Sequence, residues 1–205
     1  MSAIRNIVFD IGNVFVRWDP LAIVEAAFGI SGDDALARRQ AIFADNDIWR
    51  ALNRGEYTQD GARDAYVEAG LFTQDEAHGF FAAVYDSFHL LEDTPPLLER
   101  LVAADYRTFA LTDNVIEVVA HLSQTHDWWA HFEGVTNSAE VGVLKPDPAM
   151  YAHVLETNGL APHETVFFDD MPRNVDGAKA AGMHAFLFTD AAQAERDLAT
   201  LGVQV

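Results

Sequence analysis

The chain contains 205 residues, of which 32 are acidic and 13 are basic, so its formal net charge is −19. This length suits one domain with a small insertion, and 50% hydrophobic residues supply enough apolar surface for a core, which excludes wholesale disorder. The acidic balance argues against nucleic acid and anionic membranes as partners, because both attract basic surfaces.

The first element expected along the chain is a buried strand over residues 4–9, an apolar and β-branched run that ends at Asp10. This run is too short for a signal peptide, and no later run has the ~18 apolar residues of a membrane span. The sequence contains no cysteine, which excludes disulfides and a cysteine nucleophile. We therefore expect a cytoplasmic protein without membrane contact.

Residues 19–93 carry helix signals and no obvious strand. Four helix starts are expected, at Pro20, Ser31, Thr58 and Thr73. Glycines stand where three of these helices would end, at Gly29, Gly55 and Gly70. The pattern predicts an all-helical insertion.

Strands and helices alternate after Thr94. The expected strands cover residues 107–112, 132–136, 165–170 and 184–188. The expected helices lie around residues 97–102, at 115–123, from Asp147 onward and at 172–181. Such alternation predicts an α/β fold, a doubly wound parallel sheet with helices on both faces. The predicted domains are a core of residues 1–18 and 94–205 and a helical insertion of residues 19–93.

Polar residues follow three of these strands. Asp10 ends the first, Thr112-Asp113-Asn114 closes the next, and Asp169-Asp170 closes a later one. The carboxyl ends of strands line the binding crevice of a doubly wound sheet, so these residues are expected to meet. Lys145, one of only two lysines, precedes a predicted helix and could reach the same edge.

Phosphate chemistry explains this combination. Clustered carboxylates repel one another unless a cation holds them, and oxygen ligands of this kind favour Mg²⁺. The metal, Lys145, the Thr112 hydroxyl and backbone amides would together neutralise a phosphoryl group. Asp10 could then attack phosphorus and pass through an aspartyl-phosphate.

Four motifs, in order along nearly the whole chain, resemble those of the haloacid dehalogenase (HAD) superfamily in its helical-cap subfamily. They are Val8-Phe-Asp-Ile-Gly-Asn-Val14, Leu111-Thr-Asp-Asn114, Gly142-Val-Leu-Lys-Pro-Asp-Pro148 and Val166-Phe-Phe-Asp-Asp-Met-Pro-Arg-Asn174. The resemblance implies a Rossmann-like core, with residues 19–93 as a helical cap that selects the substrate.

The resemblance also implies roles for single residues. Asp10 is the nucleophile and Lys145 balances charge. The implied direct Mg²⁺ ligands are Asp10, the backbone carbonyl of Gly12 and Asp170. Asp169 is implied to act behind these ligands or to bind the metal through a water molecule. The implied substrate-binding residues are Thr112, Asp113, Asn114 and Asn13. The expected partner is a small phosphorylated metabolite, bound by a monomer or a homodimer.

Gly12 departs from the family pattern, since phosphatases of the superfamily usually carry there an Asp that protonates the leaving group. Relatives that share Phe-Asp-x-Gly-Asn-Val include glucose-1-phosphate and other sugar-phosphate phosphatases. An anomeric or acyl leaving group needs less protonation, which offers a reason for the glycine. Asp113 is a second departure, because many relatives have Asn at this position.

Two alternatives stay open on the same fold. A 2-haloacid dehalogenase would carry Tyr at position 12 and lack the Asp169-Asp170 pair, so the acid pair favours a phosphatase. A protein that binds a phosphorylated ligand without turnover would fit Gly12 and Asp113. A response-regulator receiver domain is excluded, because its acid pair precedes the phosphorylated Asp and it has no helical insertion.

Overall fold

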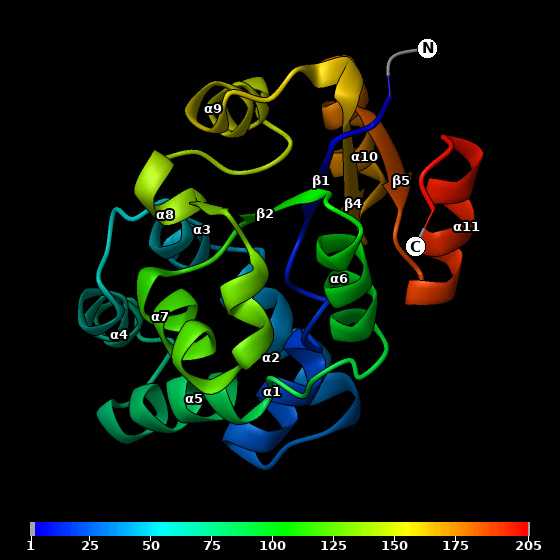
Figure 1. Cartoon of the computed structure of the whole chain (residues 1–205). Helices are drawn as coiled ribbons and strands as arrows, with labels where there is room; N and C mark the ends of the chain where they lie inside the picture. The colour runs from blue at the N-terminus through cyan, green and yellow to red at the C-terminus, as the bar shows by residue number, and fades with distance from the viewer. Residues whose placement is uncertain (1–2, 205) are drawn as a thin grey trace.

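A single parallel sheet forms the centre of the molecule (Figure 1), for which a computed structural model describes residues 3–204. Within these residues the sheet has five strands in the order β3-β2-β1-β4-β5. The strands are β1 (Asn6–Phe9), β2 (Arg107–Thr112), β3 (Gly134–Asn137), β4 (Thr165–Asp169) and β5 (His184–Leu187). All neighbours pair in parallel. The predicted doubly wound α/β fold is therefore confirmed.

Helices cover both faces of the sheet. Helices α6 (Thr94–Ala103), α7 (Ile116–Thr125) and α11 (Ala191–Thr200) share one apolar cluster with Ile7 and Phe9 of β1. Helices α9 (Pro148–Asn158) and α10 (Pro172–Ala180) share a second cluster with Val8. Successive side chains of a strand point to opposite faces, so β1 contributes to both clusters. Burial of each such side chain stabilises the fold by about 1.5–3 kcal/mol.

Between β1 and α6 the chain forms helices α1 (Pro20–Phe28), α2 (Gly32–Phe43), α3 (Ile48–Asn53), α4 (Gln59–Glu68) and α5 (Gln74–Asp86). The helix starts predicted at Pro20, Ser31, Thr58 and Thr73 are confirmed. Thr73 and Glu76 form a capping box, which satisfies two amide groups at the start of α5. Residues 19–93 contain no strand, apart from the bridge that Leu90 makes with Val16.

An aromatic cluster around Phe80 of α5 joins these five helices. The ring centroid of Phe80 lies within 6.3 Å of ring centroids of α1, α2, α3 and α4, which are those of Phe28, Phe43, Trp49 and Tyr66. The division of the chain at residues 18/19 and 93/94 into core and cap stays a prediction, and its outer ends at residues 1–2 and 205 lie outside the described residues. In the part of the chain described, no helix has both the length and the apolar character needed to cross a bilayer.

Some elements differ from the prediction. Strand β3 begins at Gly134 rather than at residue 132, and the strand predicted to end at residue 170 ends at Asp169. Helix α11 was not predicted, although Asp190 caps it and Ala191, Ala194 and Leu198 bury one face. The short helix α8 (Ser138–Val141) and 3-10 turns at Asp127–His131 and Pro162–Glu164 were also missed, because single turns carry no periodic signal.

Helix α3 lies against α8 through a close backbone approach. The hydroxyl of Ser138 donates a hydrogen bond of 2.7 Å to the carbonyl of Asn53. Gly55 has a φ of 71°, and a Cβ at this position would overlap the carbonyl oxygen of Ala139. This contact joins the helical segment to the loop that follows β3.

Gly55→Ala tests this close approach against Gly70→Ala. Both glycines have a positive φ, but a Cβ on Gly70 would meet nothing within 4 Å. We expect Gly70→Ala to lower the free energy of unfolding by about 1–2 kcal/mol, the cost of left-handed backbone for a residue with Cβ. Gly55→Ala should cost clearly more, because α3 and α8 must also separate. Urea denaturation measures both, and equal losses would contradict the close approach.

Candidate active site

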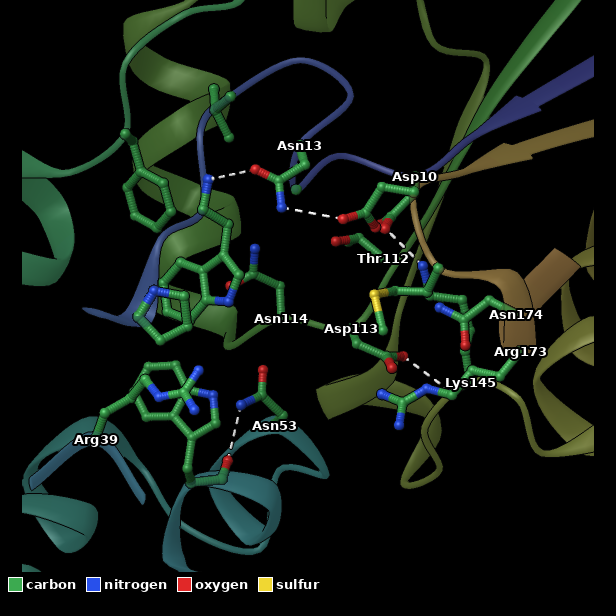
Figure 2. Close-up of a pocket in the computed structure, with 18 residues that line it drawn as sticks. Asp10, Asn13, Arg39, Asn53, Thr112, Asp113, Asn114, Lys145, Arg173 and Asn174 are labelled. Atoms are coloured by element: carbon green, nitrogen blue, oxygen red, sulfur yellow. Dashed lines mark hydrogen bonds and ion pairs between the residues drawn. The ribbon is translucent and has the colours of Figure 1, made fainter. Parts of the chain in front are cut away.

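The predicted site residues meet at the carboxyl edge of the sheet. Asp10 follows the central strand β1, Thr112 ends β2 on one side of it, and Asp169 ends β4 on the other. They line or underlie a pocket of about 480 Å³, which also includes Lys145 and Asp170. Figure 2 shows Asp10, Thr112, Asp113 and Lys145 close together on one side of this pocket. A pocket of this volume suits a small organic ligand.

Lys145 connects three strand ends. Its Nζ lies 2.8 Å from Oδ1 of Asp10 and 2.7 Å from Oδ2 of Asp169, and it donates a 3.1 Å hydrogen bond to the carbonyl of Leu111. All three N–H groups of the ammonium therefore have acceptors. The side chain is 1% exposed, so these contacts replace water almost completely.

Burial and neighbouring charges both shift the pKa values of Lys145 and Asp10. Burial would lower the pKa of Lys145, but the charges of Asp10 and Asp169 outweigh it and raise that pKa above its ordinary value. Burial raises the pKa of Asp10 well above its ordinary value, and the Asp169 charge adds to this, while Lys145 opposes both. Two carboxylates, those of Asp10 and Asp169, thus share the single buried cation of Lys145.

Asp169 is held by protein donors on both oxygens. Its Oδ1 accepts from the amide of Met171 at 2.8 Å and from Nδ2 of Asn174 at 2.9 Å. Its Oδ2 accepts from Lys145 and, at 3.1 Å, from the same Nδ2 of Asn174. Since Asp169 is fully buried and bonded, it orients Lys145 rather than facing the pocket.

Asp170 and Asn13 form the other side of the acidic cluster. Nδ2 of Asn13 donates a 3.0 Å hydrogen bond to Oδ2 of Asp170, and Oδ1 of Asn13 accepts from the amide of Trp18. Asn13 adopts a left-handed φ of 53°, which Asn tolerates better than most residues. Burial raises the pKa of Asp170, and the hydrogen bond from Asn13 opposes this.

The residues after β2 take different orientations. Thr112 lines the pocket, and its hydroxyl makes no hydrogen bond with any residue between 3 and 204. Oδ1 of Asp113 accepts a 3.0 Å bond from the amide of Lys145, so this carboxylate fixes the Lys145 backbone. Burial raises the pKa of Asp113, against the charge of Lys145. Oδ1 of Asn114 accepts from Val115, which leaves its amide group facing the pocket.

The donor set fits a hard divalent cation. Asp10, Asp169 and Asp170 can each offer an oxygen within 4.8 Å of the others. Because both oxygens of Asp169 are already bonded, Asp10 and Asp170 have the free ones, and the Gly12 carbonyl beside them accepts no hydrogen bond from a residue between 3 and 204. Oxygen donors with excess negative charge suit Mg²⁺. These residues therefore fit the Mg²⁺ ion that the sequence motifs imply.

The pocket also contains residues that the sequence reasoning missed. Arg39 of α2 and Asn53 of α3 line it opposite the acidic cluster (Figure 2), and Trp18 and Trp49 also line it. No motif marks them, because their position depends on how the helices pack. Arg50 and Arg54, in and directly after α3, both pair with Asp47, and neither lines this pocket.

A family model described as haloacid dehalogenase-like hydrolase matches residues 4–182. The chain therefore belongs to the haloacid dehalogenase-like hydrolases, and the membership predicted from the four motifs is confirmed.

Two relatives are similar to this chain over nearly all of its length. A phosphatase of Mycobacterium tuberculosis is 28% identical over 227 residues, which cover 98% of this chain and 96% of that protein. Flavin mononucleotide hydrolase 1 of Arabidopsis thaliana is 27% identical over 205 residues, which cover 97% of this chain and 78% of that protein. The chain is thus similar to one protein named as a phosphatase and to one named as a flavin mononucleotide hydrolase.

A solved structure shares the fold. It is a HAD family enzyme of Bacteroides thetaiotaomicron in complex with magnesium and inorganic phosphate, with a TM-score of 0.76 and 22% identity over 92% of this chain and 96% of that chain. At 22% identity, this similarity shows that the two chains share a fold.

Replacement of Lys145 tests its place at the centre of the site. Lys145→Met leaves Asp10 and Asp169 buried without their cation, so we expect the free energy of unfolding to fall by about 3–5 kcal/mol. The only other lysine, Lys179, is exposed at the end of α10, and Lys179→Met should change stability by less than about 0.5 kcal/mol. Urea denaturation compares the two variants. Similar small losses in both would show that the Lys145 contacts contribute little.

Proposed function

We propose that this protein is a Mg²⁺-dependent phosphatase that hydrolyses small organic phosphate monoesters, with sugar phosphates as its expected substrates. The observation that carries the proposal is the buried Lys145 between Asp10 and Asp169, beside the free oxygens of Asp10 and Asp170. A cation and metal ligands around one nucleophilic carboxylate suit phosphoryl transfer. The relatives named as phosphatase and flavin mononucleotide hydrolase, and the magnesium and phosphate in the structural neighbour, support it.

Each residue has a task in the proposed reaction. Lys145 favours the ionised form of Asp10, against the effect of burial on its pKa, and positions its carboxylate, while the Thr112 hydroxyl would bind a phosphoryl oxygen. Asp10, Asp170 and the Gly12 carbonyl would hold the metal, which supplies positive charge against the phosphoryl oxygens when bound. Asp169 and Asn174 keep Lys145 in place, and Asp113 fixes its backbone.

The bond changes are those of a two-step displacement. An oxygen of Asp10 attacks phosphorus, the bond from phosphorus to the ester oxygen breaks, and the leaving group takes a proton from water. Water then attacks the phosphorus of the aspartyl-phosphate, which releases inorganic phosphate and restores the Asp10 carboxylate. Closure of the helical segment over the pocket would exclude bulk water and select the leaving group.

A phosphate-release assay on a panel of sugar phosphates tests this proposal. We expect release that requires Mg²⁺, that stops when a chelator removes the metal, and that falls by at least about 10³-fold in Asp10→Asn, which lacks the nucleophile. Asp64→Asn, which changes an exposed carboxylate on α4, should retain full activity. Release that persists in Asp10→Asn, or that needs no metal, would rule out the proposed reaction.

Gly12 provides a test of the leaving group. A Cβ at this position would meet only the Cβ of Trp18, at 3.7 Å, so the pocket has room for a side chain there. We expect Gly12→Asp to accelerate hydrolysis of glucose 6-phosphate by about 10²-fold, because an alkoxide leaving group needs a proton donor. Glucose 1-phosphate should gain much less, since its anomeric leaving group departs more easily.

Gly12→Asn is the matched control, because it has the same shape and no acidic proton. It should accelerate neither ester. If Gly12→Asp leaves the kcat/KM of both esters unchanged, the leaving group does not explain the glycine at position 12.

One observation favours a second candidate function, binding of a phosphorylated ligand without turnover. With Gly12, the chain lacks the side chain that usually donates a proton, and Asp113 places an additional carboxylate at the pocket. Ligand binding without phosphate release across the panel would favour this second function.

A further inference from the structure

The pocket continues beyond the acidic cluster towards helices α2 and α3. Every carboxylate that lines it follows a strand of the sheet, namely Asp10, Asp113 and Asp170. The opposite side carries Arg39 and Asn53, as Figure 2 shows. A substrate whose phosphoryl group lies at Asp10 would extend its leaving group in this direction.

Two arginines line the pocket, Arg39 and Arg173, and neither forms an ion pair with a residue between 3 and 204. Arg173 lies beside Asp113, on the side of the acidic cluster, whereas Arg39 lies on the opposite side (Figure 2). Most arginines pair with a carboxylate, and the neighbouring Arg38 does so with Glu76. Arg39 forms no ion pair and donates no side-chain hydrogen bond to any residue between 3 and 204, although the chain has 32 acidic residues. Its guanidinium is therefore free to bind a ligand.

Three aromatic rings line the same pocket as Arg39. The ring of Trp18 stacks on those of Trp49 and Phe88, with centroids 5.5 and 6.1 Å apart. All three are half-buried and line the pocket. Arg39 itself is exposed, so an anion bound there would form a partly hydrated ion pair with it. No carboxylate among residues 3–204 lines this end of the pocket to compete for Arg39.

We propose that Arg39 binds a second anionic group on the leaving group of the substrate. The enzyme then prefers phosphate monoesters that carry a carboxylate or a further phosphate to esters with a neutral leaving group. The planar guanidinium presents paired N–H donors that match either anion. This preference rests on the proposed phosphatase function, whose site provides the opposite end of the same pocket.

Three esters with the same sugar ring test the preference. Glucose 1-phosphate, glucuronic acid 1-phosphate and glucose 1,6-bisphosphate differ at C6, which carries a hydroxyl, a carboxylate or a phosphate. Calorimetric titration of the Asp10→Asn protein with Mg²⁺ measures binding without turnover. We expect at least one of the two doubly anionic esters to bind about fivefold more tightly than glucose 1-phosphate, the size of a well-placed exposed ion pair. The tighter of the two identifies the anion that Arg39 accepts.

Two neighbouring arginines provide matched variants in the same background. Arg39→Gln should bring the ratio of dissociation constants to about one. Arg38→Gln removes the same charge one residue away, where the side chain pairs with Glu76 and lies outside this pocket, and should leave the ratio unchanged.

Failure of this proposal is distinct from failure of the phosphatase function. Equal binding of all three esters, binding of none of them, or a preference that survives Arg39→Gln would overturn the role of Arg39. Phosphate release by the protein with Asp10 intact reports on the catalytic function separately. If the protein prefers doubly anionic esters through Arg39 but releases no phosphate, the anion subsite is established and the phosphatase function is rejected.

Discussion

The ion pairs of Lys145 with Asp10 and Asp169 are the interaction on which the site depends. They bring charged groups from a loop and from two strand ends into a volume almost without water. Removing charges from water costs several kcal/mol for each ion, so the arrangement persists only because each donor of the ammonium has an acceptor. The central position of β1 between β2 and β4 makes this possible, because it brings three strand ends together.

The same arrangement would allow an acidic protein to bind an anionic ester, as the proposed function requires. A net charge of −19 gives no long-range attraction to phosphate, so binding must be local. Lys145 and a metal held by Asp10 and Asp170 would supply positive charge at one end of the pocket, because a bound divalent ion reverses the local field. In the proposed subsite, Arg39 would supply positive charge at the other end of the pocket.

The sequence predicted the sheet and the acidic end of the pocket well, for a physical reason. Parallel strands end at a common edge, so Asp10, Thr112 and Asp169 could be placed together without knowing any side-chain contact. Lys145 stood out in a chain with almost no lysine. Arg39 could not be found in this way, because its place depends on how α2 packs beside α3, which no local pattern records. Helix α11 carries a signal in its acid cap, Asp190, and in its buried face, although it was not predicted.

The role of Asp10 is the central claim, and it has a direct chemical test. The protein is mixed with Mg²⁺ and a phosphate ester that it hydrolyses, quenched in acid within milliseconds, and treated with borohydride, which reduces an aspartyl-phosphate to homoserine. Mass spectrometry of the peptides then locates the modified residue. The proposed reaction predicts homoserine at position 10 and nowhere else. Modification of a different carboxylate, or none during steady turnover, would contradict it.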